Sequence, residues 1–233
     1  MEKINKIKAE FVRHGKPTYS EEEYKSGKFE GTLTENGKKE LEETINKLAE
    51  NISDDELVVI LSSPKKRAIE SAEIAHKILK EKGVNIFPSL KITDSLKDIQ
   101  MTPEFVESLK DFEGFWMEYW AKKNLPEGVE KPEDVKKRAQ RVIAYLNRVG
   151  KIKNLTQKIR FVLFGHEEGV RDLLMEAFGI DTEKGEGPTY AENISVNFFN
   201  VGENATKLEV SYRDKKGVLD FDSKTRDFKK RSE

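Results

Sequence analysis

Short apolar runs alternate with longer amphipathic segments along most of this chain. Three of the runs, at residues 7–12, 57–61 and 159–164, end in uninterrupted apolar residues. Runs of this length that lack regular polar alternation are typical of strands buried on both faces of a sheet. We therefore expect three central strands, with a weaker candidate at residues 85–90 and two later strands at residues 193–201 and 207–212.

The segments between these runs have the periodicity of helices. Leu41, Ile45 and Leu48 fall on one helical face, and Thr34 is suited to cap the start of that helix. Segments with similar apolar faces follow the strand at residues 57–61 and lie on both sides of the strand at residues 159–164. They predict helices that begin at Pro64, Pro132 and Glu167, and Gly83 and Gly179 are suited to end the first and last of these.

Three further stretches complete the predicted organisation. Residues 103–122 carry aromatic side chains at helical spacing, and they lie within an insertion at about residues 94–131. We expect this insertion to be a helical cap that packs on the core, with some of its rings lining a substrate pocket. Residues 15–33 predict a loop, and the charged residues 222–233 predict a frayed C-terminal tail.

The alternation of strands and helices places the chain in the α/β class. We expect a single domain over residues 1–221 that is built as a three-layer sandwich, with a mostly parallel central sheet flanked by helices and a helical cap insertion. In such sheets, ligands bind beyond the carboxyl ends of the strands.

Composition narrows the classes of function. The 233 residues include 42 Lys and Arg against 43 Asp and Glu, a net charge of -1 that does not indicate a nucleic-acid-binding protein. The absence of cysteine excludes disulfides, thiolate metal sites and cysteine nucleophiles. The first six residues lack an apolar signal core and no apolar run could span a membrane, so we expect a cytoplasmic protein without a membrane partner.

Two of the three histidines follow predicted strands directly, and arginines accompany them. Arg13 precedes His14, Arg67 follows the second strand, and Arg171 lies five positions after His166. Nearby guanidinium groups disfavour an imidazolium ion, which leaves a neutral ring nitrogen free to act as a nucleophile. The same arginines can bind phosphate oxygens and stabilise the charge of a transferring phosphoryl group. Taken singly, each residue is unremarkable for its position, and the combination predicts phosphoryl transfer.

These stretches resemble the histidine phosphatase superfamily, which has the phosphoglycerate mutase-like fold. The similarity runs from about residue 7 to residue 213 and rests on several ordered motifs. They are Arg13-His14-Gly15, Gly31-Thr32-Leu33-Thr34-Glu35-Asn36-Gly37, Ser62-Ser63-Pro64-Lys65-Lys66-Arg67-Ala68, Gly165-His166-Glu167-Glu168-Gly169-Val170-Arg171 and Asn193-Ile194-Ser195-Val196.

The resemblance implies a role for each matching residue. His14 would be the nucleophile that becomes phosphohistidine, and Arg13, Arg67 and His166 would line the phosphate pocket. The proton donor of the family is usually a glutamate in an L-x-E segment, and Asp98 occupies the matching position here.

Asp94 and Glu104 remain rivals to Asp98, because aspartate is one methylene shorter than glutamate.

The chain departs from the family pattern after each histidine. Lys16, Thr18 and Lys25 stand in a loop where the family often has an asparagine and a Gly-Arg pair. We assign Gly15, Lys16, Thr18 and Glu167 to substrate binding. Glu167 and Glu168 replace small residues. They either stabilise a helix start or form a negative rim that discourages highly anionic substrates.

The leading prediction is a histidine acid phosphatase-like phosphomonoester hydrolase that acts on a small-molecule phosphate ester and needs no metal or other cofactor. The alternatives are a phosphoglycerate mutase-type phosphotransferase, a non-catalytic phospho-ligand binding module, and a metal hydrolase that uses the histidines as ligands. The oligomeric state stays open, with a homodimer as one alternative.

Overall fold

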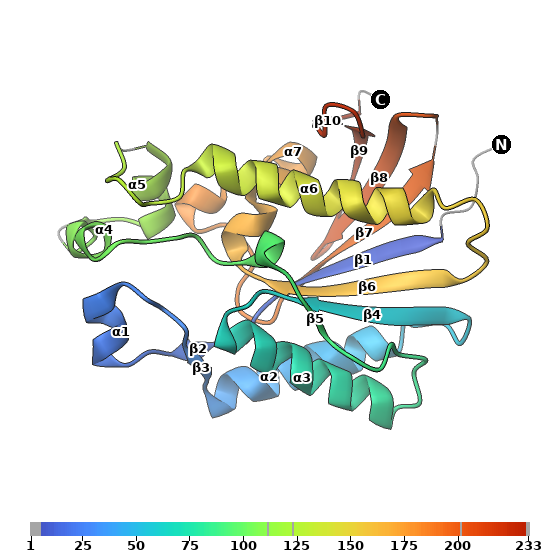
Figure 1. Cartoon of the computed structure of the whole chain (residues 1–233), viewed down its shortest axis with the longest axis horizontal. Coiled ribbons are helices and arrows are strands. Elements are labelled where there is room, and N and C mark those ends of the chain that lie inside the picture. The colour runs from blue at the N-terminus through green and yellow to red at the C-terminus, as the bar shows by residue number, and fades with distance from the viewer. Residues whose placement is uncertain (1–5, 111, 123, 201, 232–233) are drawn as a thin grey trace.

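One mixed sheet forms the centre of the molecule (Figure 1). The structure, a computed structural model, describes residues 6–231 except 111, 123 and 201. The order of the strands is β10-β9-β8-β7-β1-β6-β4-β5. They are β1 (Ile7–Arg13), β4 (Glu56–Ser62), β5 (Lys91–Ile92), β6 (Lys158–Gly165), β7 (Asn193–Asn200), β8 (Ala205–Tyr212), β9 (Lys215–Asp222) and β10 (Phe228–Lys230).

The parallel half of the sheet is the half predicted from the apolar runs. Strand β6 lies between β1 and β4 and pairs in parallel with both, and β4 pairs in parallel with β5. The weak strand candidate at residues 85–90 is wrong, because Ile86 makes only an isolated bridge to Val58 and strand β5 follows it.

The other half of the sheet is antiparallel, so the expectation of a mostly parallel sheet holds only for β1, β4, β5 and β6. Strands β7 to β10 form antiparallel pairs with their neighbours, and β7 is antiparallel to β1. Arg213 and Asp214 alone join β8 to β9, and a connection this short permits only antiparallel neighbours. The predicted strand 193–201 is confirmed to Asn200; residue 201 lies outside the described residues.

The predicted frayed tail is wrong for the residues that the structure describes. Strand β10 pairs with β9, and Phe228 packs against the buried core of the sheet. An edge strand needs few apolar residues, and this one has a single large apolar side chain among charged neighbours, so its sequence does not look like a strand. Residues 232 and 233 lie outside the described part of the chain.

Helices cover both faces of the sheet, which confirms the three-layer arrangement (Figure 1). On one face lie α2 (Glu35–Ala49) and α3 (Lys66–Glu81), whose apolar sides pack on the sheet through Leu41, Ile45 and Ala72. On the other face lie α6 (Pro132–Gly150) and α7 (Arg171–Phe178). No helix in the described residues is both long enough and apolar enough to cross a membrane.

The cap insertion is helical, as predicted, and the stretch at residues 103–122 is divided into two short helices. These are α4 (Pro103–Ser108) and α5 (Trp116–Lys122), and Gly114 lies in the connection between them. The cap has its own small core, in which Phe105, Met117 and Trp120 are buried. The aromatic stripe thus mainly holds the cap together.

The segment predicted as a loop at residues 15–33 contains regular structure. It forms a short hairpin of β2 (Pro17–Thr18) and β3 (Thr32–Leu33), with helix α1 (Glu21–Ser26) between the two strands. Ser20 and Glu23 form a capping box at the start of α1, a local signal that the sequence analysis did not use. Figure 1 shows α1, α4 and α5 at the end of the sheet where β1, β4 and β6 finish.

The turn after β1 packs directly against the start of α2. A Cβ atom on Gly15 would lie 2.7 Å from the carbonyl oxygen of Gly37, and one on Gly37 would lie 2.4 Å from that of Lys16. Thr34 also binds the Lys16 carbonyl through its backbone N–H, at 2.9 Å. The two glycines therefore allow backbones to approach closely and fix the position of His14.

Replacing Gly37 with alanine should lower the free energy of unfolding by about 1–3 kcal/mol, because the new methyl group meets backbone atoms that cannot move freely. Urea unfolding followed by circular dichroism measures the change. Gly169→Ala is the matched control, because a Cβ there would meet nothing within 4 Å. Equal stabilities for the two variants would contradict the packing argument.

Candidate active site

The carboxyl ends of the central strands bring the two strand-end histidines together. In the parallel register of β1 and β6, Arg13 lies beside Gly165, and the backbone N–H of His14 donates to the Gly165 carbonyl at 3.1 Å. The imidazole rings of His14 and His166 consequently lie 5.0 Å apart, centroid to centroid. The predicted meeting of the two histidines is present in the structure.

The tautomer of His14 is fixed by its own turn. Nδ1 lies 2.8 Å from the carbonyl oxygen of Gly15 and donates its hydrogen to it. Nε2 therefore carries the lone pair, and it accepts a hydrogen bond from Nε of Arg67 at 2.9 Å. Burial, followed by electrostatic interactions with His166 and with the charge of Arg67, holds the pKa of His14 well below its ordinary value. His14 is thus a neutral imidazole with an available nitrogen.

Arg67 connects most of the polar groups of this site. It enters from the first turn of α3, and Nη1 donates to the carbonyl oxygens of Phe29 at 2.5 Å and Glu30 at 3.0 Å. Nη2 forms an ion pair with Asp98 and donates to Nδ1 of His166 at 3.2 Å. The guanidinium group is therefore held from several sides beside the nucleophile candidate.

His166 is held in the opposite tautomer. Its Nδ1 accepts from Arg67, so Nε2 carries the hydrogen and donates to Oγ of Ser63 at 2.8 Å. Burial lowers the pKa of His166 to about 3, despite the opposing charge of Asp98. Ser63 follows β4 directly and is a site residue that the sequence analysis did not single out, although it lies in the quoted Ser-Ser-Pro motif.

Arg13 lies on the other side of the histidines. Its Nη1 forms an ion pair with Glu167 at 2.8 Å and donates to the Pro188 carbonyl at 2.6 Å. The guanidinium carbon lies 4.3 Å from the centre of the Tyr190 ring, in cation–π geometry. Tyr190 was not predicted, because an isolated tyrosine in a glycine-rich loop gives no sequence signal.

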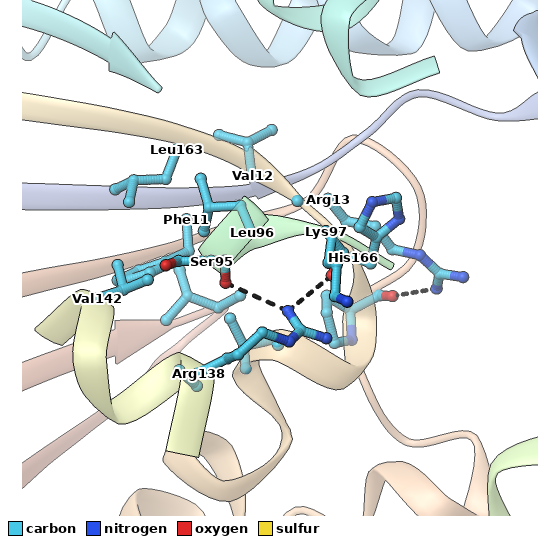
Figure 2. Close-up of a pocket in the computed structure, with 16 residues that line it drawn as sticks. Phe11, Val12, Arg13, Ser95, Leu96, Lys97, Arg138, Val142, Leu163 and His166 are labelled. Atoms are coloured by element: carbon cyan, nitrogen blue, oxygen red, sulfur yellow. Dashed lines mark hydrogen bonds between the residues drawn. The ribbon is translucent and has the colours of Figure 1, made fainter. Parts of the chain in front are cut away.

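The segment that carries Asp98 is anchored by helix α6. Figure 2 shows Nη1 of Arg138 reaching two backbone carbonyls of this segment, those of Ser95 at 3.2 Å and Lys97 at 2.8 Å. The other nitrogens of Arg138 bind both carboxylate oxygens of Glu130, at 2.8 and 2.9 Å. A buried arginine on the core thus sets the position of the candidate acid.

A cavity of about 990 Å³ opens beyond these groups, between the strand ends and the cap. Its floor contains both histidines, Arg13 and Arg67 with three acidic residues, while its outer wall is largely aromatic or apolar. The floor acids are Asp98, Glu167 and Glu168, and the wall includes Tyr19, Tyr24, Phe29, Met101, Val106, Leu109 and Trp116.

The structure sorts the predicted site residues into two groups. His14, Arg13, Arg67, His166, Asp98 and Glu167 line the cavity, as does the rival acid Glu104. Gly15, Lys16, Thr18, Asp94 and Arg171 do not line it.

The residues outside the cavity have structural contacts of their own. Lys16 and Thr18 are exposed, and their backbones support the turn and the β2–β3 hairpin. The backbone N–H of Gly15 donates to Ser71. Arg171 forms ion pairs with Asp172 and Glu183. The structure gives Lys16 and Thr18 no contact with the candidate phosphate site.

Glu167 and Glu168 do not form the negative rim that the sequence suggested. Both side chains are buried at the floor of the cavity, in the short 3-10 helix Glu167–Val170 that precedes α7. Burial raises the pKa of Glu167, opposed by the charge of Arg13. These acids therefore lie within the site.

One cluster has the spacing of a metal site. Ligand atoms of Asp98, His166 and Glu168 lie within 4.8 Å of one another. Arg67 is already paired with Asp98 and bonded to His166, and a guanidinium group in that position opposes a divalent cation. We therefore describe the three residues as a hydrogen-bonded group around Arg67.

The comparisons with known proteins agree with this geometry. A profile of the histidine phosphatase superfamily (branch 1) matches residues 10–213, which is most of the chain. The chain belongs to the histidine phosphatase superfamily. No curated protein sequence matches it.

Solved structures share the fold over nearly their whole length. "Mycobacterial hydrolase 1" is 16% identical with a TM-score of 0.62, and the match covers 90% of this chain and 99% of that chain. A mycobacterial glucosyl-3-phosphoglycerate phosphatase is 15% identical with a TM-score of 0.61, covering 88% and 97%. A putative alpha-ribazole-5'-P phosphatase from Escherichia coli is 14% identical with a TM-score of 0.58, covering 89% and 96%. At these identities the likeness shows the fold alone.

Replacing Arg138 with lysine should lower phosphate-ester turnover at least tenfold, because an ammonium group cannot bind both backbone carbonyls and Glu130 at once. The measurement is kcat/KM together with the free energy of unfolding. Arg141→Lys, on an exposed position of the same helix, is the matched control and should change neither. Full activity of the Arg138 variant would show that α6 does not position the acid.

The buried histidine also predicts a pH-dependent stability. The pKa of His166 is about 3 in the folded protein and about 6.5 in an unfolded chain, so below pH 6.5 only the unfolded chain takes up this proton. Between pH 6.5 and 4.5 this group should therefore lower the free energy of unfolding by up to about 1.4 kcal/mol per pH unit as the pH falls. Urea unfolding at several pH values should show a smaller slope for His166→Gln than for the wild type; identical slopes would contradict the assignment.

Proposed function

We propose that this protein is a phosphomonoester hydrolase that works through a phosphohistidine on His14. The observation that carries the proposal is the fixed tautomer of His14, whose Nδ1 donates to Gly15 and whose Nε2 lone pair lies beside Arg67. A neutral imidazole with one defined lone pair, next to a guanidinium group, suits attack on a phosphate ester.

In the proposed reaction, Arg67, Arg13 and His166 bind the phosphoryl oxygens. The arginines are already ion-paired with Asp98 and Glu167, so a bound phosphate competes with these carboxylates for the guanidinium groups. Nε2 of His14 attacks phosphorus in line with the departing oxygen, and water then cleaves the phosphohistidine. The residues supply positioning and charge stabilisation, and we propose that no metal is required.

The cavity wall favours an ester with an apolar or aromatic group attached to the phosphate. Rings of Tyr19, Phe29 and Trp116 face the same space as the two histidines. Lys25 and Lys110 on the wall are balanced by Glu21, Glu104 and Glu107, so the wall offers no clear second phosphate site. This argues against a bisphosphate intermediate and therefore against a mutase.

One further observation supports hydrolysis, and another supports binding of a phosphate-like anion. The cavity wall includes exposed residues such as Glu21 and Lys25, so water can enter, whereas a mutase must keep water from its phosphoenzyme. A glucosyl-3-phosphoglycerate phosphatase with the same fold, 16% identical with a TM-score of 0.57, is described as a complex with VO3, an oxyanion related to phosphate.

Replacing His14 with alanine should lower hydrolysis of p-nitrophenyl phosphate by about 10³-fold or more, with chelator present throughout, because the nucleophile is removed. His76→Ala is the control: His76 lies on α3, outside the cavity, and its loss should leave the rate unchanged. A phosphoryl label that is labile in acid and stable in base should be trapped on the wild type and not on the His14 variant.

Other results would select an alternative. Conversion of a phosphate ester to an isomer without release of phosphate would indicate a mutase. Saturable phosphate binding with no turnover of any ester would indicate a binding module. Activity that disappears in chelator and returns with a divalent cation would indicate a metal hydrolase.

A further inference from the structure

Three carboxyl groups share the floor of the cavity, and each has a different environment. Glu167 is paired with Arg13, and Asp98 is paired with Arg67. Glu168, of which only 4% is exposed, has no cation of its own among the described residues. Its Oε1 is buried without a hydrogen-bond partner, and its side chain is hydrogen-bonded to Asp98.

A hydrogen bond between two carboxyl groups requires a proton on one of them. Arg67 decides which one, because its charge stabilises Asp98 as the anion and leaves Glu168 as the acid. Burial and the neighbouring charge of Asp98 raise the pKa of Glu168 well above its ordinary value. Burial alone would also raise the pKa of Asp98, but the electrostatic interaction with His166 and the charge of Arg67 hold it below the ordinary range. The Glu168 side chain is therefore a neutral acid, and Asp98 cannot supply a proton near neutral pH.

We propose that Glu168 is the proton donor to the leaving oxygen and that Asp98 is a positioning residue for Arg67 and Glu168. This inference rests on the phosphohistidine chemistry proposed above. It reassigns the role that the sequence pattern gives to Asp98, and it gives a function to a buried acid that a superfamily motif does not predict.

The position of Glu168 suits this role. It follows His166 by two residues and lines the same cavity as His14, with a carboxyl oxygen within 4.8 Å of a ring nitrogen of His166. In-line transfer places the leaving oxygen beyond phosphorus, about 5 Å from Nε2 of His14. The His14 and His166 rings are themselves 5.0 Å apart, so an ester bound against both imidazoles lies within reach of Glu168.

Glu168 alone supplies and recovers the proton needed for formation and hydrolysis of the phosphohistidine. As the bond from His14 Nε2 to phosphorus forms, the bond to the ester oxygen breaks, and that oxygen takes the Glu168 proton and leaves as an alcohol. The Glu168 carboxylate then removes a proton from the attacking water. The new bond from oxygen to phosphorus forms, the electron pair of the broken bond returns to Nε2, and Glu168 is again an acid.

The neighbouring anion makes this cycle favourable. Once Glu168 has lost its proton, two adjacent buried carboxylates share one guanidinium group, an arrangement that raises the free energy of the phosphoenzyme. Taking a proton from water relieves this repulsion. Asp98 therefore assists the second step without exchanging a proton itself.

The test compares two esters whose leaving groups differ in their need for a proton. Nitrophenolate leaves p-nitrophenyl phosphate without protonation, whereas the alkoxide of n-propyl phosphate needs it. The measured quantity is the propyl-to-nitrophenyl ratio of kcat/KM, expressed per substrate dianion. Glu168→Gln should lower this ratio by about 10²-fold or more at pH 5, where Glu168 of the wild type carries its proton. The neighbouring variant Glu167→Gln should keep the wild-type ratio whatever its absolute rates.

Asp98→Asn separates a donor from a positioning residue. If Asp98 only raises the pKa of Glu168, the variant still turns over n-propyl phosphate at pH 5, and the pH at which the ratio declines moves downward from its wild-type value. If Asp98 is the donor, Asp98→Asn loses the propyl ester at every pH while Glu168→Gln retains it, and that result would overturn the inference.

A measurement on the wild type covers the case in which Glu168→Gln does not fold. The wild-type ratio should decline as the pH rises and Glu168 loses its proton, and a ratio that is constant from pH 5 to pH 9 would overturn the assignment. Hydrolysis of neither ester by the wild type is a different result. It would overturn the proposed function, and this inference with it.

Discussion

The site depends on one guanidinium group held beside a neutral imidazole. Arg67 binds Nε2 of His14, Nδ1 of His166 and the carboxylate of Asp98, while two backbone carbonyls hold its remaining nitrogen. Each of these contacts comes from a different part of the chain. The register of β1 with β6, the start of α3 and the anchoring of the Asp98 segment by Arg138 all serve to bring these groups within hydrogen-bond distance.

Charge balance explains why a proposed phosphate site contains the three acids Asp98, Glu167 and Glu168. Arg13 and Arg67 are matched by Glu167 and Asp98, both histidines are neutral, and Glu168 keeps its proton. The buried group is thus close to neutral before a ligand enters, which avoids the large cost of burying unpaired charge. In the proposed reaction, a phosphate dianion would displace these carboxylates from guanidinium groups that are already oriented.

The sequence predicted the parts of this architecture that have local signals. The apolar runs marked β1, β4 and β6, and the residues that follow them contain the histidines and the α3 arginine. It failed where the signal was weak or absent: β10 has one large apolar residue, α1 is short, and Tyr190 lies in an irregular loop. Lys16 and Thr18 do not line the cavity, and adjacency in sequence does not show which way a side chain points. The partition of protons between Asp98 and Glu168 could not be read from the sequence, because it depends on burial and on the position of Arg67.

The separate core of the cap has a consequence for how this protein could change over evolutionary time. Phe105, Met117 and Trp120 pack in a cluster of cap residues that is joined by Val135 of α6 and is separate from the two cores that hold the sheet and its helices. Substitutions in the cap wall can therefore alter the shape offered to the organic part of a ligand while the strand-end histidines keep their geometry. The two parts of the fold can therefore evolve separately. The sheet can keep the reacting groups unchanged, while substitutions in the cap change which compounds bind.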